Sequence, residues 1–149
     1  MFQTAPSHPS GSRAWRVVVA DDHREMRSLL RLWLEMEGLS VVEARNGSEL
    51  VRCIVKEPDE PGVDLVISDV RMPSFSGLEI LRGICPIYPK LPIILITGFG
   101  APELHREAIQ LGAYRVLDKP VPQEMLTKVV LQALARKAQP PGRSQPRLE

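Results

Sequence analysis

Hydrophobic and polar positions alternate along the chain in blocks that predict five strands, each followed by a helix. Short apolar runs rich in β-branched residues predict strands at 15–20, 40–44, 63–68, 91–97 and 114–117. Apolar residues at helical spacing predict helices at 22–37, 46–57, 77–84, 101–111 and 122–137. The strands read as continuous apolar runs, which is expected when helices cover both faces of a sheet. The pattern therefore predicts an α/β fold with a doubly wound, five-stranded parallel sheet.

Polar side chains stand where the predicted strands end. The residues concerned are Asp21, Asp22, Asp69, Thr97, Asp118 and Lys119. Because the carboxyl ends of parallel strands meet at one edge of the sheet, we expect these groups to converge there. Three of the carboxylates, one hydroxyl and one ammonium group would then line a shallow pocket.

A cluster of three carboxylates needs a cation or protonation to offset its mutual repulsion. An oxygen-only ligand set of Asp21, Asp22 and Asp69 favours Mg²⁺. With such an ion present, Asp69 is either a ligand only or also a nucleophile that forms an aspartyl phosphate, with Lys119 and Thr97 facing the phosphoryl oxygens. An alternative for Asp21 or Asp22 is a capping role at the start of the first helix.

Composition narrows the class of protein. The chain has 149 residues, 44% hydrophobic and 25% charged, which suits one globular domain with a substantial core. A net charge of +1 creates no strong field that would favour nucleic acid or a membrane surface. Two cysteines cannot form a disulfide framework, and no apolar stretch approaches the ~20 residues of a membrane span. We expect a soluble cytoplasmic protein.

The two ends of the chain are polar and rich in proline. Residues 1–13 are predicted to be a disordered tail, and residues 139–149 a disordered tail or linker stub. Residues 14–138 then form the folded domain. The histidines His8, His23 and His105 lack partners at metal-ligand spacing, so we expect all three to be solvated bystanders.

Four segments together resemble the receiver domain of bacterial two-component response regulators, the CheY-like superfamily. They are "VVVADDHREMRSLL", "DLVISDVRMPSFSGLEIL", "PIILITGFG" and "GAYRVLDKP", and the resemblance covers residues 15–137. It implies a flavodoxin-like fold with strand order 2-1-3-4-5, and it makes residues 14–138 a receiver domain.

The resemblance also implies a role for each strand-end residue. Asp69 would accept a phosphoryl group from a histidine kinase or a histidine phosphotransfer protein. Mg²⁺ would be held by Asp21, Asp22, Asp69 and the backbone carbonyl of Arg71. Thr97 and Lys119 would bind the phosphoryl oxygens, and the peptide between Lys119 and Pro120 would be cis.

One position departs from the family pattern. The family often places an aromatic residue three positions before the lysine, where this chain has Val116. Tyr114, two residues earlier and expected on the same strand face, is a weak substitute. Phe99 and Arg71 flank the site; either they restrict water access and lengthen the lifetime of the phosphoryl group, or Phe99 packs on the surface and Arg71 points to solvent.

The implied function is a signalling switch rather than an enzyme, limited to self-phosphotransfer and autodephosphorylation. The surface formed by helix 101–111, strand 114–117 and helix 122–137 would carry the output, and a homodimer through it is one arrangement that the resemblance allows. The alternative is a phosphorylation-independent, receiver-like protein-binding module, which Val116 favours. A phosphatase with an Asp nucleophile is disfavoured because Arg71 stands where such enzymes generally carry a second Asp.

Overall fold

The computed structural model describes residues 5–11, 13–58, 60–98 and 100–139, in which five strands alternate with five helices. The strands are β1 (Arg16–Ala20), β2 (Ser40–Ala44), β3 (Leu65–Asp69), β4 (Ile93–Thr97) and β5 (Arg115–Asp118). The helices are α1 (Arg24–Glu35), α2 (Gly47–Ile54), α3 (Gly77–Ile84), α4 (Pro102–Gln110) and α5 (Gln123–Ala138). Every predicted strand and helix is therefore present, with ends shifted by only a few residues.

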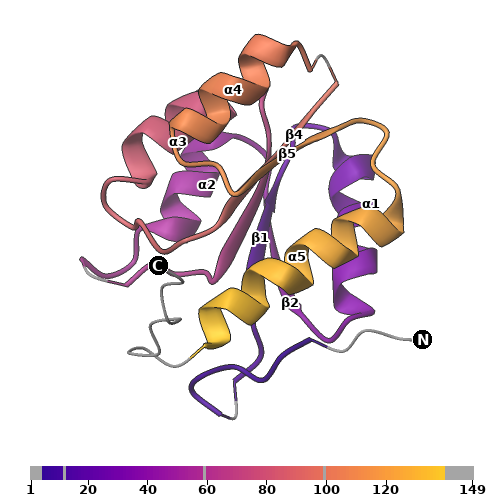
Figure 1. Ribbon diagram of the computed structural model, residues 1–149, viewed down its shortest axis with the longest axis vertical. Helices are drawn as coiled ribbons and strands as arrows, with labels where there is room; N and C mark the ends of the chain where they lie inside the picture. Colours follow the sequence, from indigo (N-terminus) through magenta and orange to yellow (C-terminus); the bar gives the residue numbers. More distant parts are fainter. Residues whose placement is uncertain (1–4, 12, 59, 99, 140–149) are drawn as a thin grey trace, which may run out of the picture.

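The sheet is parallel throughout, with strand order β2-β1-β3-β4-β5. Helices α1 and α5 cover one face, and α2, α3 and α4 cover the other (Figure 1). This arrangement confirms the doubly wound, flavodoxin-like prediction. Because all five strands run the same way, their carboxyl ends share one edge, which is where ligands bind in open α/β sheets.

The core consists of two apolar layers separated by the sheet. In β1, Val17 and Val19 pack with α1 and α5, whereas Val18 packs with α2 and α3. All three valines are fully buried. Burial of such a side chain contributes roughly 1.5–3 kcal/mol. The double burial explains why the strands read as unbroken apolar runs rather than as alternating patterns.

Local hydrogen bonds fix the starts of two helices near the sheet edge. The Asn46 side chain accepts a hydrogen bond of 2.9 Å from the Glu49 N–H at the start of α2. At the start of α3, Ser76 and Glu79 form a reciprocal capping box. Each such cap stabilises the folded protein by about 1 kcal/mol. The caps also fix the residue at which each helix begins.

Helix α1 begins at Arg24, two residues later than predicted, because residues 21–23 form a loop over the sheet edge. The Asp21 side chain accepts a hydrogen bond of 2.8 Å from the His23 N–H, which holds this turn outside the helix. His23 occupies the N-cap position with an extended backbone. The alternative in which Asp21 or Asp22 caps the first helix is therefore wrong.

The described part of the N-terminal segment packs against the domain. His8 lies 4.4 Å from the Trp15 ring, its side chain is 8% exposed, and its Nε2 lies 3.4 Å from Asp64 Oδ1. The Trp15 indole N–H donates to the Pro6 carbonyl. The expectation that His8 is solvated is wrong. A disordered tail was predicted for residues 1–13, whereas His8 and Pro6 in this segment contact the folded domain. The tail predicted beyond Gln139 lies outside the described residues.

Within those same described ranges, the helices are all too short or too polar to cross a membrane.

Candidate functional site

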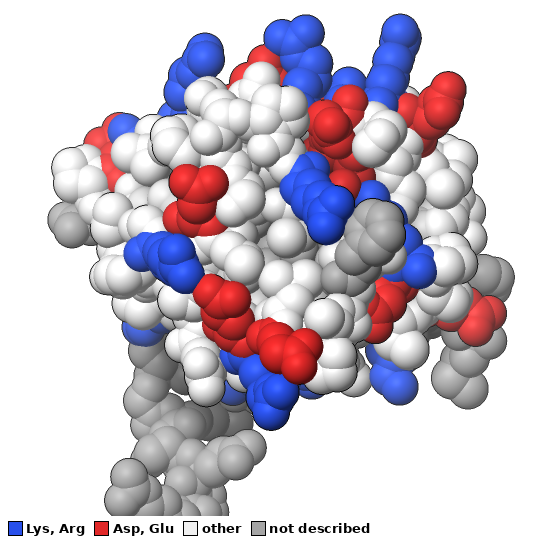
Figure 2. All heavy atoms as spheres, turned by 90° about the horizontal axis from the view of Figure 1, so that it is seen from above, with Lys and Arg blue, Asp and Glu red and all other residues white. Residues whose placement is uncertain are grey.

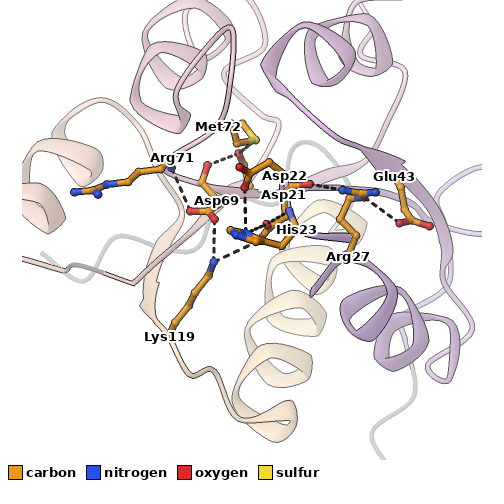
Figure 3. Close-up of polar contacts among 10 residues, drawn as sticks. Asp21, Asp22, His23, Arg27, Glu43, Asp69, Arg71, Met72 and Lys119 are labelled. Atoms are coloured by element: carbon orange, nitrogen blue, oxygen red, sulfur yellow. Dashed lines mark hydrogen bonds and ion pairs between the residues drawn. The ribbon is translucent and has the colours of Figure 1, made fainter. Parts of the chain in front are cut away.

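Three carboxylates converge at the carboxyl edge of the sheet. Asp21 and Asp22 follow β1, and Asp69 is the last residue of the neighbouring strand β3. Together with His23, each offers a ligand atom, and these atoms all lie within 4.8 Å of one another (Figure 3). Asp21 and Asp69 are buried, whereas Asp22 is exposed. The convergence expected from the strand ends is therefore present, and one carboxylate faces solvent.

Lys119 supplies positive charge to this cluster. Its Nζ donates a hydrogen bond of 2.9 Å to Asp69 Oδ2 and lies 3.4 Å from Asp21 Oδ2 (Figure 3). Burial alone would lower the pKa of Lys119, but the hydrogen bond to Asp69 and the charges of Asp21 and Asp69 outweigh it, so that this pKa is raised. Lys119 is therefore a fixed cation, shared between two carboxylates.

The backbone holds Thr97 beside Lys119. Thr97 ends β4, is 3% exposed, and is paired in register with Asp118 of β5. The Lys119 N–H donates to the Thr97 carbonyl at 2.8 Å. The peptide between Lys119 and Pro120 is cis, as the family resemblance implied. The pairing of β4 with β5 thus brings a hydroxyl side chain and an ammonium side chain to the same sheet edge.

The loop after β3 closes tightly on Asp69. The Arg71 N–H donates to Asp69 Oδ1 at 3.2 Å, so both oxygens of this carboxylate have donors. The Gly77 N–H donates to the Val70 carbonyl, and a Cβ at Gly77 would lie 2.9 Å from the Asp69 carbonyl oxygen. Glycine is needed there because a side chain would push this loop away from the strand. The role of the Arg71 carbonyl as a metal ligand stays a prediction.

Two residues that support the site were not predicted from the sequence. Arg27 is buried, and its Nη1 donates a hydrogen bond of 2.7 Å to the Asp21 carbonyl. Its Nε also contacts Glu43 at 3.2 Å (Figure 3). The available signal was its position in the buried stripe of α1, shared with Leu30 and Leu34, where a charged residue needs a partner.

His23 is the second residue that was missed. Its Nδ1 lies 3.1 Å from Asp21 Oδ1 and 3.2 Å from Asp22 Oδ1. The His23 side chain is 72% exposed, as expected of a solvated residue, but its contacts with both carboxylates were not predicted. The third histidine, His105, is not a bystander, because its Nε2 lies 2.9 Å from Asp118 Oδ1.

The weak switch candidates separate in space. Val116 packs with the α2–α4 side of the sheet, whereas Tyr114, just before β5, packs with the α1–α5 side, so the shared strand face predicted for them is wrong. The Tyr114 ring lies under the Arg115 guanidinium at 4.8 Å and the Arg136 guanidinium at 5.9 Å. Tyr114 therefore sits at the start of its strand, opposite the end that bears Lys119. Phe99 lies outside the described residues.

The donor set fits a hard divalent cation. Carboxylate oxygens are the ligands that Mg²⁺ prefers, and a partly exposed site suits an ion that keeps several waters. Asp21 and Asp22 supply such oxygens from the loop after β1, and Asp69 supplies them from the end of β3. Lys119 lies close enough to Asp69 and Asp21 to bond both. The excess of negative charge gives the site affinity for a further cation.

A family model described as "Response regulator receiver domain" matches residues 17–131 of this chain. The C4-dicarboxylate transport transcriptional regulatory protein DctD of Pseudomonas aeruginosa is 40% identical over 119 residues, covering 80% of this chain and 25% of that protein. The transcriptional regulatory protein FixJ of Bradyrhizobium diazoefficiens is 32% identical over 131 residues, covering 87% of this chain and 60% of that protein. The chain thus spans only part of the length of these relatives.

Solved structures show the same fold. A response regulator receiver domain protein from Clostridium thermocellum superimposes with a TM-score of 0.76 at 32% identity, covering 83% of this chain and 96% of that one. The chemotaxis response regulator CheY4 of Vibrio cholerae gives a TM-score of 0.72 at 28% identity, covering 81% and 99%. The residue range matched by the family model includes every strand-end residue of the site, from Asp21 to Lys119.

Proposed function

Since this chain belongs to the family of response regulator receiver domains, we propose that it accepts a phosphoryl group on Asp69 from a histidine of a sensor kinase or phosphotransfer protein. The observation that carries the proposal is the 2.9 Å contact between Asp69 Oδ2 and Lys119 Nζ, beside Asp21 and Asp22. An acceptor carboxylate, a fixed cation and metal-ligating oxygens lie within one small site. The domain acts as a switch whose only chemistry is phosphotransfer to itself and autodephosphorylation.

The transfer is a displacement at phosphorus. An oxygen of Asp69 forms the new bond to phosphorus, the bond between phosphorus and the donor nitrogen breaks, and its electron pair stays on that nitrogen. Such a step needs mainly positioning and neutralisation of the charge on the phosphoryl oxygens. Lys119 contributes one positive charge, and the Thr97 hydroxyl contributes a hydrogen bond.

Asp69 and the backbone carbonyl of Arg71 would hold a metal ion together with Asp21 and Asp22, which would do so directly or through water. When bound, Mg²⁺ supplies the remaining positive charge that the phosphoryl oxygens require. Arg27 keeps the Asp21 loop in place through its 2.7 Å hydrogen bond to the Asp21 carbonyl. This hydrogen bond supports the position of the Asp21 loop without any contribution from an ion.

The proposed output is a change at the surface of α4, β5 and α5. Asp118, the strand partner of Thr97, bonds His105 of α4 at 2.9 Å. A Cβ at Gly100 would lie 1.8 Å from Asp118 Oδ1, so the loop that leads into α4 packs tightly on this pair. Movement of Thr97 toward a phosphoryl group would shift these contacts. This polar pair takes the place of the aromatic switch residue that Val116 replaces.

The proposal names proteins, not nucleic acid, as partners of this chain. Figure 2 looks onto the sheet edge that carries the site, where acidic and basic side chains are intermixed. The net charge of the whole chain is +1, so the chain creates no strong single-sign field of the kind that attracts nucleic acid. A homodimer through α4, β5 and α5 is part of the same proposal. So is a cytoplasmic location, which the free cysteines Cys53 and Cys85 support.

A second candidate is a protein-binding module that keeps the fold without using phosphate. The observation in its favour is Val116, which removes the usual aromatic readout. The intact acidic site argues against it, because a pure binding module gains nothing from three clustered carboxylates whose charge Lys119 offsets only in part.

A small phosphodonor such as acetyl phosphate separates the two candidates. The full chain is incubated with this donor and Mg²⁺, and its intact mass is measured beside Asp69→Asn and the control Asp118→Asn, which removes an exposed carboxylate near the site. We expect one added phosphoryl group on the wild type and on the control, and none on Asp69→Asn. An unmodified wild type would favour the binding module.

A further inference from the structure

We infer that His23 is a nitrogen ligand of the metal site, so that this site also takes first-row transition metal ions such as Mn²⁺ and Co²⁺. The inference rests on the proposed function in one respect, the use of Asp21, Asp22 and Asp69 as metal ligands. It adds a donor of a different chemical type, and with it a second class of ion.

The backbone places the His23 ring over the carboxylates. Its N–H donates to Asp21 Oδ1 at 2.8 Å, which fixes the residue at the start of α1. The ring then brings Nδ1 to 3.1 Å from Asp21 Oδ1 and 3.2 Å from Asp22 Oδ1 (Figure 3). The side chain is 72% exposed, so an ion can approach it from solvent.

The separations suit ligands of a single ion. Neighbouring ligands of an octahedral ion with bonds of about 2.1 Å stand about 3.0 Å apart, and opposite ligands stand about 4.2 Å apart. The two contacts of His23 Nδ1 are close to the shorter value. All four donor atoms, including one from Asp69, lie within 4.8 Å of one another. Small side-chain rotations would bring them around one ion.

The chemistry of imidazole sets the preference among ions. Mg²⁺ prefers oxygen ligands, whereas imidazole nitrogen suits first-row transition metals, for which affinity rises along the series from Mn²⁺ to Cu²⁺. His23 Nδ1 faces an oxygen of Asp21 and an oxygen of Asp22, so an ion bound among these atoms would meet a nitrogen donor as well as carboxylate oxygens. His23 therefore adds little to Mg²⁺ binding and much to the binding of Mn²⁺ or Co²⁺.

Titration calorimetry of the full chain tests this preference. Mg²⁺, Mn²⁺ and Co²⁺ are titrated separately into the wild type, His23→Gln and the control His8→Gln, which removes an imidazole beside Asp64, just before β3 and at the opposite end of that strand from Asp69. We expect His23→Gln to weaken Mn²⁺ and Co²⁺ binding by at least about tenfold, while Mg²⁺ binding changes less than about twofold. His8→Gln should leave all three affinities unchanged. Circular dichroism confirms that each variant is folded.

The outcomes distinguish this inference from the proposed function. Equal Mn²⁺ and Co²⁺ affinities in the wild type and His23→Gln, with Mg²⁺ binding intact, would overturn the role of His23 and leave phosphotransfer to Asp69 untouched. Binding of Mn²⁺ that depends on His23, in a protein that acquires no phosphoryl group, would support the ligand assignment and count against the proposed function.

Discussion

Strand β3 has a buried aspartate at each end, and the two have opposite surroundings. Asp64, just before the strand, and Asp69, its last residue, are both 7% exposed. Asp64 accepts hydrogen bonds of 2.9 and 3.0 Å from Arg13 Nη2 and one of 2.8 Å from the Arg16 N–H. Burial alone would raise the pKa of Asp64, but these donors outweigh it and hold the pKa below its ordinary value.

Among the described residues, the ion pairs of Asp69 give it no cation of its own. It shares Lys119 with Asp21, and Asp22 lies in the same cluster. A carboxylate whose charge is matched by its own partners holds two parts of the chain together. Carboxylates that outnumber the cations beside them keep an affinity for a further cation, at a cost in stability. Two equally buried aspartates thus differ in charge balance, which suits a structural role for Asp64 and the proposed phosphoacceptor role for Asp69.

The largest expected effect is stabilisation by Mg²⁺, which should depend on one end of the strand only. An ion that binds the folded state at one hundred times its dissociation constant stabilises that state by about 2.7 kcal/mol. We expect Asp64→Asn to keep this gain and Asp69→Asn to lose most of it. Urea denaturation of each protein with Mg²⁺ or with a chelator measures the difference, and an equal gain in both variants would contradict the comparison.

Without metal, we expect the same two substitutions to have opposite effects on stability. Asp64→Asn removes charge-assisted hydrogen bonds to Arg13, and we expect a loss of about 2 kcal/mol in the free energy of unfolding. Asp69→Asn relieves repulsion from Asp21 and Asp22, so its stability should equal or exceed that of the wild type. Urea denaturation in the presence of a chelator gives both values. If Asp69→Asn is less stable than the wild type, the negative charge of the three clustered carboxylates is already compensated without metal.

Much of this contrast could be predicted from the sequence, because strand periodicity and strand-end position fix where the site residues go. The apolar runs located all five strands, and the parallel sheet then required Asp21, Asp69 and Lys119 to meet. Burial of both sheet faces makes such runs continuous, which is why the signal was strong.

The parts that were not predicted depend on loops. The burial of His8 follows from its contacts with Trp15 and Asp64, which no periodic pattern encodes. The position of His23 depends on a turn held by the Asp21 side chain. Tyr114 lies just before its strand begins, so the alternation of strand faces did not apply to it.

The smallest expected effect is the change in the stability contribution of Asp64 at acidic pH. Because the folded-state pKa of Asp64 is lowered, its contribution is fully present above the unfolded pKa of about 3.9 and is lost as pH falls through the folded value. The stability gap between wild type and Asp64→Asn should therefore be constant near neutrality and shrink below about pH 4. Urea denaturation midpoints of both proteins, measured from pH 7 downward, test this. A stability difference that stays constant below about pH 4 would show that the Arg13 contact is unimportant.

The central claim is that Asp69, and not the equally buried Asp64, carries the phosphoryl group. Borohydride reduces an aspartyl phosphate to homoserine, which marks the acceptor in a peptide map. After treatment with a phosphodonor and Mg²⁺, we predict homoserine at position 69 within the tryptic peptide 57–71, and an aspartate still at position 64. Homoserine at position 64, 21 or 22, with Asp69 unchanged, would contradict the account.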